Sequence, residues 1–279
     1  MNKKALFVLF VFVLFVASVV SGKLYWNKKV ANATQQAGET KRETKVEEVS
    51  TQKQSAKTEE KKTEEKKPET KVSFNEAYAK NLPDAVKEKL KKAAADKKAV
   101  NLVIVGDQAS AADAWPAKLT ANLKQAYGES LWNVTVKEFK DESTDDLIAK
   151  NRDKEIVDAK PDVILFEPPF VTDNSKSGNG NSVANTQKFV KSLQAGAKDA
   201  VIMIQPPNPV YNAKNYPKAI AALKQLAEQN GYTYINHWEV WPDPTKKSIL
   251  PYLQDEFGFP SAKGHELWAQ YVTNYFVAK

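Results

Sequence analysis

The 279-residue sequence contains no cysteine and only two histidines. Without cysteine the chain has no disulfide bonds, no thiolate metal ligands and no cysteine nucleophile. It also lacks a glycine-rich phosphate loop, and no group of acidic residues and histidines has the spacing of a metal site. We therefore expect neither a cofactor nor a bound metal ion.

An excess of positive charge is missing from the greater part of the chain, although the formal net charge is +7. Residues 1–29 hold five lysines and no acidic residue, whereas residues 74–279 hold 26 basic and 25 acidic residues. A nearly neutral C-terminal part has no basic face of the kind that binds nucleic acid. Nucleic acid is therefore not expected as a partner.

A long uncharged stretch at residues 5–22 is the first feature that is present. Eighteen apolar or small residues can cross a bilayer core of about 30 Å at about 1.5 Å per residue. The apolar region of a cleaved signal peptide is shorter, about 7–15 residues. Residues 1–29 are therefore predicted to be an uncleaved signal anchor in the cell membrane, with the folded part outside the cytoplasm. Cleavage after Val19-Val20-Ser21, followed by secretion, is the alternative.

Residues 30–72 differ in composition from both neighbouring segments. They hold ten basic residues, nine glutamates and no aromatic residue, with the tandem repeat Thr58-Glu-Glu-Lys-Lys62 and Thr63-Glu-Glu-Lys-Lys67. Such a segment cannot bury enough apolar surface to offset the entropy lost on ordering. We predict a disordered tether, while a single exposed helix held by Glu–Lys pairs is the alternative.

The remaining residues, 73–279, alternate between strand-like and helix-like patterns. Five apolar strand-like runs, each followed by a helical pattern, predict a parallel sheet covered by helices on both faces. The fold class is therefore α/β, a three-layer α/β/α sandwich with a flavodoxin-like, doubly wound sheet. Strands are expected at 100–105, 132–139, 161–166, 200–205 and 232–236, and helices at 83–98, 116–127, 144–159, 185–195, 217–229 and 262–277.

Four segments carry a specific resemblance over nearly the whole folded part. They are Val105-Gly106-Asp107-Gln108, Ser143-Thr-Asp-Asp-Leu147, Phe166-Glu-Pro-Pro-Phe-Val-Thr-Asp173-Asn174 and Pro260-Ser-Ala-Lys-Gly264-His265-Glu-Leu-Trp268. They resemble the conserved blocks of the SGNH/GDSL hydrolases. The resemblance implies ester hydrolysis by a serine, with a histidine and an acid completing a triad. It also implies that the serine N–H, a glycine N–H and an asparagine side chain hold the oxyanion.

Each functional position of that family is altered in this sequence. Gln108 stands at the nucleophile position, and its amide cannot attack an ester. Asp141 falls on the glycine of the oxyanion site, where an anionic side chain is unfavourable. The oxyanion asparagine falls on Thr172 or Asn174. In the last block the acid is Glu256, and the base position holds Phe259.

A different triad is conceivable from nearby residues. Ser110 is two residues from Gln108, and His265 lies near the start of the last predicted helix. With Glu256 or Asp255 orienting the imidazole, Ser110 and His265 satisfy the logic of serine, base and acid. Structural roles are the alternative, since Ser110 can satisfy backbone groups in a turn and His265 can pack within its helix. The other histidine, His237, ends a predicted strand and reads as a hydrogen-bonded residue at the edge of the core.

A proline-rich loop at residues 205–217 carries two tyrosines and three asparagines, and two tryptophans follow the next predicted strand. Aromatic faces beside amide groups suit the apolar faces and hydroxyl rims of sugar rings. Ordinary packing beneath a long loop is the alternative. The candidate binding residues here are Asn208, Tyr211, Trp238 and Trp241.

Two functions of different classes follow. The first is an extracytoplasmic, membrane-anchored SGNH-type hydrolase that acts on acylated envelope glycans or related esters through a rewired serine site. The second is a catalytically inactive relative that binds envelope polysaccharide. The expected partners are thus an envelope glycan or acyl ester and, through the N-terminal anchor, the membrane.

Overall fold

The computed structural model describes residues 74–176, 178, 180–254 and 258–278. The predicted anchor, the predicted tether and the candidate acids Asp255 and Glu256 lie outside these residues. Within them, no helix combines the length and the apolar character needed to cross a membrane.

A five-stranded sheet forms the centre of the described part of the chain, with the strand order β2-β1-β3-β4-β5. Every neighbouring pair of strands is parallel, which confirms the predicted α/β class and the parallel sheet. The strands are β1 (Val100–Gly106), β2 (Trp132–Glu138), β3 (Val163–Phe166), β4 (Val201–Ile204) and β5 (Thr233–Tyr234).

Strand β1 is the longest buried strand, because helices cover it on both faces. Its alternate side chains enter two separate cores: Leu102 and Ile104 lie in one, and Val103 and Val105 lie in the other. A strand buried on both faces requires a nearly continuous apolar run, and the sequence of β1 provides one. Its last residue, Gly106, therefore emerges at the carboxyl edge of the sheet.

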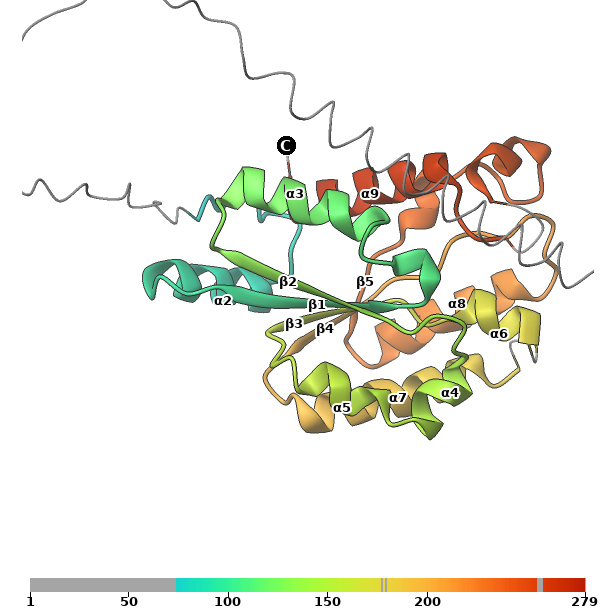
Figure 1. The fold of residues 1–279 in the computed structure, drawn as a ribbon, viewed down its shortest axis with the longest axis horizontal. Helices are drawn as coiled ribbons and strands as arrows, with labels where there is room; N and C mark the ends of the chain where they lie inside the picture. Colours follow the sequence, from blue (N-terminus) through green and yellow to red (C-terminus); the bar gives the residue numbers. More distant parts are fainter. Residues whose placement is uncertain (1–73, 177, 179, 255–257, 279) are drawn as a thin grey trace, which may run out of the picture. The chain divides into compact units, whose positions relative to one another are not determined.

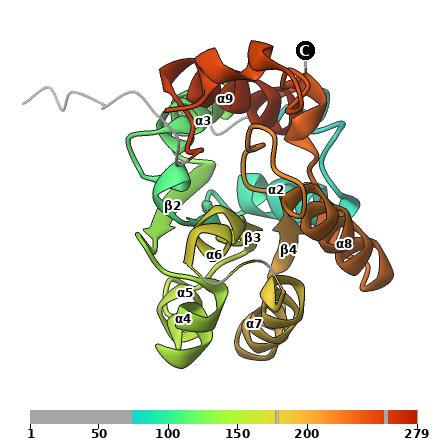
Figure 2. The same cartoon turned by 90° about the vertical axis from the view of Figure 1, so that its right-hand side faces the viewer.

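Three helices cover the first face of the sheet: α2 (Asp84–Ala95), α3 (Trp115–Tyr127) and α9 (Ala262–Phe276). Figures 1 and 2 show α3 and α9 side by side above the sheet. Buried leucines of α2 and α3 meet large aromatic residues of α9, chiefly Trp268 and Phe276, in the first core. This layer also covers the carboxyl ends of β3 and β4.

The second face is covered by α4 (Thr144–Ala149), α5 (Arg152–Val157), α7 (Ser182–Gly196) and α8 (Tyr216–Gln229). Figure 1 shows α4, α5 and α7 on the side opposite α3 and α9. The second core also includes Phe170 and Val171 of a short helix, α6 (Phe170–Lys176), which follows β3.

Several predicted boundaries differ from the structure for identifiable reasons. The helix predicted at 144–159 is two helices, because Asn151 adopts a left-handed φ of 52° between α4 and α5. The strand predicted at 232–236 is only the two residues of β5. The helix predicted from 185 begins at Ser182. Helix α6 was not predicted, since two prolines precede it and its apolar pattern is short.

Helix α2 ends in a Schellman motif without glycine. The N–H of Lys98 donates to the carbonyl of Ala93 at 2.9 Å, and that of Lys97 donates to the carbonyl of Ala94 at 3.4 Å. Lys97 occupies the left-handed position of the motif with a φ of 53°. Glycine is usual there because a side chain in this conformation is strained.

The two ends of the described domain meet. The N–H of Ala278 donates to the carbonyl of Tyr78 at 2.8 Å. The hydroxyl of Tyr127, on α3, donates to the carbonyl of Phe276 at 2.7 Å, and the rings of Phe74 and Tyr127 stack with their centroids 6.5 Å apart. One aromatic residue therefore fixes both ends.

Candidate functional site

The candidate site begins at the turn that follows β1. A 3-10 helix, η1 (Gln108–Ser110), starts here, and the carboxylate of Asp107 caps it by accepting from the N–H of Ala109 at 2.9 Å. Gly106 is required at the start of the turn: a Cβ there would lie 2.8 Å from the Ser110 hydroxyl oxygen and would also collide with Glu167. The turn therefore holds three side chains close to the carboxyl edge of the sheet.

Gln108, at the position where the resemblance implies the nucleophile, is bound through both groups of its amide to one residue. Its Oε1 accepts from the backbone N–H of Asp141 at 3.0 Å, and its Nε2 lies 3.3 Å from Asp141 Oδ1. Asp141 has a φ of 56°, a conformation that favours the glycine of the family. The backbone N–H that the resemblance assigns to the oxyanion site is therefore already occupied by an amide carbonyl.

Ser110 is completely buried and has two side-chain partners. Its hydroxyl makes a short hydrogen bond to Glu167 Oε2, and it accepts from the indole N–H of Trp115 at 3.0 Å. His265 is not among the hydrogen-bond partners of Ser110, and the pairing of these two residues stays a prediction. The buried hydroxyl of Ser110 thus provides a hydrogen-bond partner for the carboxyl group of Glu167 and for the indole N–H of Trp115.

His265 lies in the first turn of α9, which Ser261 caps from its side-chain oxygen. Burial lowers the pKa of His265, while the nearby carboxylate of Asp113 opposes that shift. Its Nδ1 is buried and has no hydrogen-bond partner among the described residues. The acids proposed to orient it, Asp255 and Glu256, lie outside those residues.

His237 begins a second 3-10 helix, η2 (His237–Val240), and is fully buried. Trp241 Nε1 donates to its Nδ1 at 2.9 Å, so its Nε2 carries the proton and donates to the carbonyl of Pro206 at 2.6 Å. Its ring stacks on Trp268 at 4.1 Å between centroids. Burial lowers the pKa of His237 to about 3, so the imidazole is neutral and held on three sides.

Two buried carboxyl groups lie beneath the turn. Burial raises the pKa of Asp107 to about 6, against the opposing hydrogen bonds from Ala109 and Thr172. Burial raises the pKa of Glu167 well above its usual range, and the charge of Asp107 raises it further. Sequence reasoning did not include Glu167 among the candidate residues. The available signal was an acidic residue directly after the four-residue apolar strand β3.

Glu167 belongs to a wider buried polar cluster on the α3 and α9 side of the sheet. Gln205, at the end of β4, accepts from the indole N–H of Trp268 at 3.1 Å. Trp268 stacks in turn on Trp115, with centroids 5.3 Å apart. Three buried polar atoms at this edge have no partner among the described residues: Glu167 Oε1, Gln205 Nε2 and Asn208 Oδ1.

The two candidates for the oxyanion asparagine have different surroundings. Thr172 is buried on α6, and its hydroxyl donates to Asp107 Oδ2 at 3.1 Å. Asn174 is exposed on the same helix. The structure therefore brings Thr172 to the candidate site and leaves Asn174 on the surface.

Phe259, at the position of the family's base, packs against both cores. Its backbone carbonyl accepts from the N–H of Gln254 at 2.7 Å. A phenyl ring has no proton to give or take, so the site lacks a base at this position.

The residues proposed to contact sugar rings are more buried than the sequence indicated. Asn208 is fully buried and donates to the carbonyl of Pro209 at 3.0 Å. Trp241 is 7% exposed. Tyr211 and Trp238 are half-buried, and the indole N–H of Trp238 already donates to the carbonyl of Pro207 at 2.7 Å. Of this set, only Tyr211 and Trp238 are half-buried, and the ring of Trp238 stacks on buried Tyr216 with centroids 5.9 Å apart.

The described residues contain no group of three acidic or histidine side chains placed to hold a metal ion. At this edge the backbone N–H of Asp141 is occupied by Gln108, Ser110 is buried, and the two carboxyl groups, those of Asp107 and Glu167, have raised pKa values. Among the described residues, no hydrogen bond joins Ser110 to either histidine.

Comparison of the sequence with family descriptions gives no match, and comparison with curated proteins gives none either. Solved structures do match the fold. A mutant of Axe2, an acetylxylan esterase from Geobacillus stearothermophilus, is 16% identical with a TM-score of 0.54, over 63% of this chain and 94% of that one.

Two further structures give the same result. A protein assigned to the G-D-S-L lipolytic family from Desulfitobacterium hafniense DCB-2 is 18% identical, with a TM-score of 0.51 over 63% of this chain and 99% of that one. A GDSL-like lipase from Parabacteroides merdae ATCC 43184 is 10% identical, with a TM-score of 0.55 over 64% and 96%. The chain therefore has the α/β/α fold of SGNH esterases, which confirms the fold that the resemblance implied.

Proposed function

We propose that this chain is a non-hydrolysing SGNH-fold protein of the cell envelope that binds acylated glycans or related esters. One observation carries the proposal: Gln108 stands where the family resemblance puts the nucleophile, and both groups of its amide are bound to Asp141. An ester carbonyl that sought the N–H of Asp141 would first have to displace Gln108. The usual oxyanion contact is thus made within the protein.

The state of Ser110 and of His237 supports the same proposal. Ser110 has no exposed surface, and its hydroxyl is bound to Glu167 and Trp115. A nucleophile must reach its substrate, and a hydroxyl with no exposed surface cannot do so. The imidazole of His237 is committed to Trp241 and Pro206, and it is uncharged at neutral pH.

The ligand class rests on the fold and on the accessible aromatic faces. The Geobacillus structures of the same fold are described as esterases of acetylxylan and of acetyl-xylooligosaccharides. Tyr211 and Trp238 are half-buried aromatic residues near the carboxyl edge of the sheet. Such rings stack on sugar faces, and neighbouring amides bind hydroxyl groups. An envelope glycan carrying acyl groups combines these two features.

The proposed location follows from the apolar run at residues 5–22, which would anchor the chain in the cell membrane with residues 73–279 outside the cytoplasm. Protease treatment of intact and of permeabilised cells tests this placement. Cleavage of the folded domain in intact cells is expected. Protection until the membrane is opened would contradict it.

The catalytic half of the proposal is tested with the full-length chain, acetylated xylo-oligosaccharide as substrate and a fluorophosphonate as serine label. We expect no acetate release above buffer and no labelled serine. The variant Gln108→Ser with Phe259→His rebuilds the nucleophile and base of the family and frees the N–H of Asp141. A label on Ser110 in the unaltered chain, with turnover lost in Ser110→Ala, would instead establish the rewired serine esterase.

The binding half is tested by calorimetry with the acetylated oligosaccharide and its deacetylated form. Tyr211→Ala and Trp238→Ala should each weaken binding about tenfold or more, since loss of one stacked aromatic ring typically costs over about 1 kcal/mol. Val240→Ala is the matched control, because Val240 is 42% exposed on η2 and contributes no ring. Equal affinity in all three variants would refute glycan binding at this loop.

A further inference from the structure

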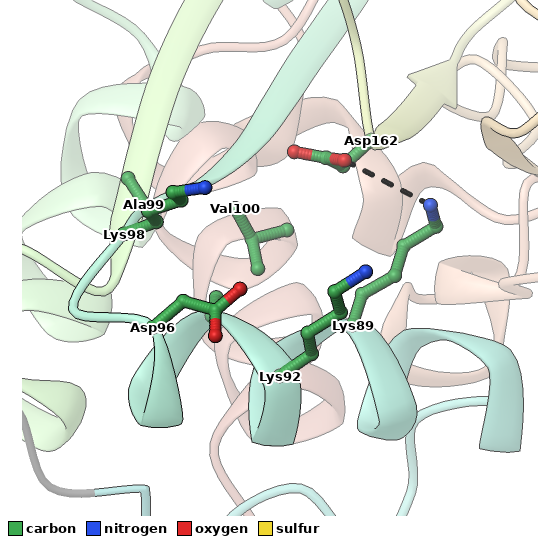
Figure 3. A pocket seen from close by; sticks show the side chains of 8 residues that line it. Lys89, Lys92, Asp96, Lys98, Ala99, Val100 and Asp162 are labelled. Carbon is green, nitrogen blue, oxygen red and sulfur yellow. Dashed lines mark ion pairs between the residues drawn. The ribbon is translucent and has the colours of Figure 1, made fainter.

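A cavity of about 280 Å³ lies at the end of the sheet opposite the candidate site. It is formed by the last turns of α2, the first residues of β1 and the residue before β3 (Figure 3). Seven strand residues at about 3.3 Å each separate this edge from the carboxyl edge. The cavity is therefore independent of Gln108 and its surroundings. Its charged lining residues are Lys89, Lys92, Asp96, Lys98 and Asp162.

The cavity has an excess of one positive charge, from three lysines against two aspartates. Asp162 is already engaged: its Oδ2 accepts from the N–H of Asn101 at 2.9 Å, and its Oδ1 lies 3.8 Å from the ammonium of Lys89. Figure 3 shows Lys89 and Lys92 extending from α2 toward the strands. Lys92 and Lys98 form no ion pair with the described residues, so two ammonium groups are available to a ligand.

The floor of the cavity is apolar, since Ala93 and Val100 are buried. Lys98 reaches the cavity because the left-handed Lys97 reverses the chain at the end of α2. Lysine near a helix C-terminus is common, because the helix dipole attracts cations there. That preference accounts for lysine at each position taken alone. It does not account for a cavity with an apolar floor between α2 and the strands.

We propose that this cavity binds a phosphate group carried on a small polyol or sugar. Lysine ammonium groups bind phosphate as point charges, and two unpaired lysines beside a partly neutralised third supply the needed field. The volume lies just below the range of about 300–1,000 Å³ for ligand pockets, which suits one phosphate with a few carbon atoms on Ala93 and Val100. A soluble metabolite, a unit of an anionic wall polymer and a phospholipid headgroup share this chemistry.

The proposal is tested by calorimetry of the full-length chain with glycerol 3-phosphate, using glycerol as the neutral control. We expect a Kd on the order of 1 mM that weakens with added salt, and no heat from glycerol. Lys92→Gln with Lys98→Gln should weaken binding about tenfold or more, because each charge-assisted hydrogen bond is a strong one. Lys188→Gln with Lys191→Gln, two exposed residues of α7, makes the same change in net charge elsewhere and should have little effect.

A variant that binds more tightly separates loss of the site from loss of folding, because an unfolded chain would not gain affinity. Asp96→Asn removes a negative charge from the cavity wall and should tighten the binding of glycerol 3-phosphate severalfold. Absence of binding, or equal weakening by both lysine pairs, would overturn the proposal. Vesicles of phosphatidylglycerol distinguish the sources: binding to vesicles without any binding of soluble glycerol 3-phosphate would assign the lysines to a membrane surface and refute the pocket.

Discussion

Replacement of Asp107 by asparagine tests the electrostatics beneath the turn. Burial raises the pKa of Asp107 from 3.8 to about 6 in the folded chain. The native state therefore binds this proton more tightly than the unfolded state does. Stability contributed by the protonated group is fully present below about pH 4 and is lost as pH rises through about 6. A shift of about two pKa units corresponds to about 3 kcal/mol.

Asparagine is neutral at every pH and keeps the shape of aspartate. Its oxygen can still accept from the N–H of Ala109, and its NH₂ can donate to the hydroxyl oxygen of Thr172. We therefore expect Asp107→Asn to be close to neutral at pH 4 and to stabilise the chain by about 3 kcal/mol at pH 7.5. Urea unfolding at pH 4, 6 and 7.5 measures the difference between variant and parent.

Comparison with the parent chain is necessary because other acids titrate in the opposite sense. Hydrogen bonds from Arg152 lower the pKa of Glu142, and those from Ser143 lower the pKa of Asp146. Their contributions to stability are present at neutral pH and lost in acid. They cancel in the difference. Exposed Asp199→Asn is the control and should show no comparable trend. A stability difference for Asp107→Asn that is constant with pH, or that turns destabilising as pH rises, would refute the reasoning.

Three further substitutions test separate features by urea unfolding. Gly106→Ala should destabilise the chain by about 1–3 kcal/mol, because its Cβ would lie 2.7 Å from Ser110 Cβ, whereas Gly180→Ala, with open space around it, should be nearly neutral. Lys97→Gly should stabilise the chain by about 0.5–1 kcal/mol, because glycine adopts the left-handed φ of 53° without strain. Lys98→Gly is the control and should not stabilise it. Equal effects of the two substitutions would show that Lys97 is not strained. Trp241→Phe should lower the free energy of unfolding by about 1–3 kcal/mol, because the buried Nδ1 of His237 loses its hydrogen-bond donor. An unchanged urea midpoint would show that this hydrogen bond contributes nothing to stability.

The parallel sheet could be predicted because its three central strands, β1, β3 and β4, are short, apolar and mostly buried, a pattern typical of parallel sheets. Strand β5 was overestimated, since residues 232–236 (Tyr-Thr-Tyr-Ile-Asn) have side chains that favour strands but only two of them pair with β4. The break at Asn151 could not be predicted, because a left-handed residue inside a helical pattern depends on how α4 and α5 pack against α7.

The location of the candidate site could be predicted from the sequence, whereas most of its contacts could not. Sequence order puts Gly106, Glu167 and Gln205 at the ends of neighbouring strands, and the structure places them there. That Gln108 would bind Asp141 through both amide atoms requires coordinates, because 33 residues separate the pair. The depth of Ser110 and Trp241 likewise depends on α3 and α9, whose packing is a tertiary property. The roles predicted for Ser110, His265 and Glu256 remain predictions.

The contact between Tyr78 and Ala278 has a consequence for engineering and evolution. A domain whose ends touch can be circularly permuted, because a short linker joins the old ends without distorting the fold. New ends opened at the exposed Lys198–Asp199 turn, between α7 and β4, would leave the whole sheet intact. For the same reason the domain could be inserted as a unit into a surface loop of an unrelated protein, with both of its connections leaving from one spot.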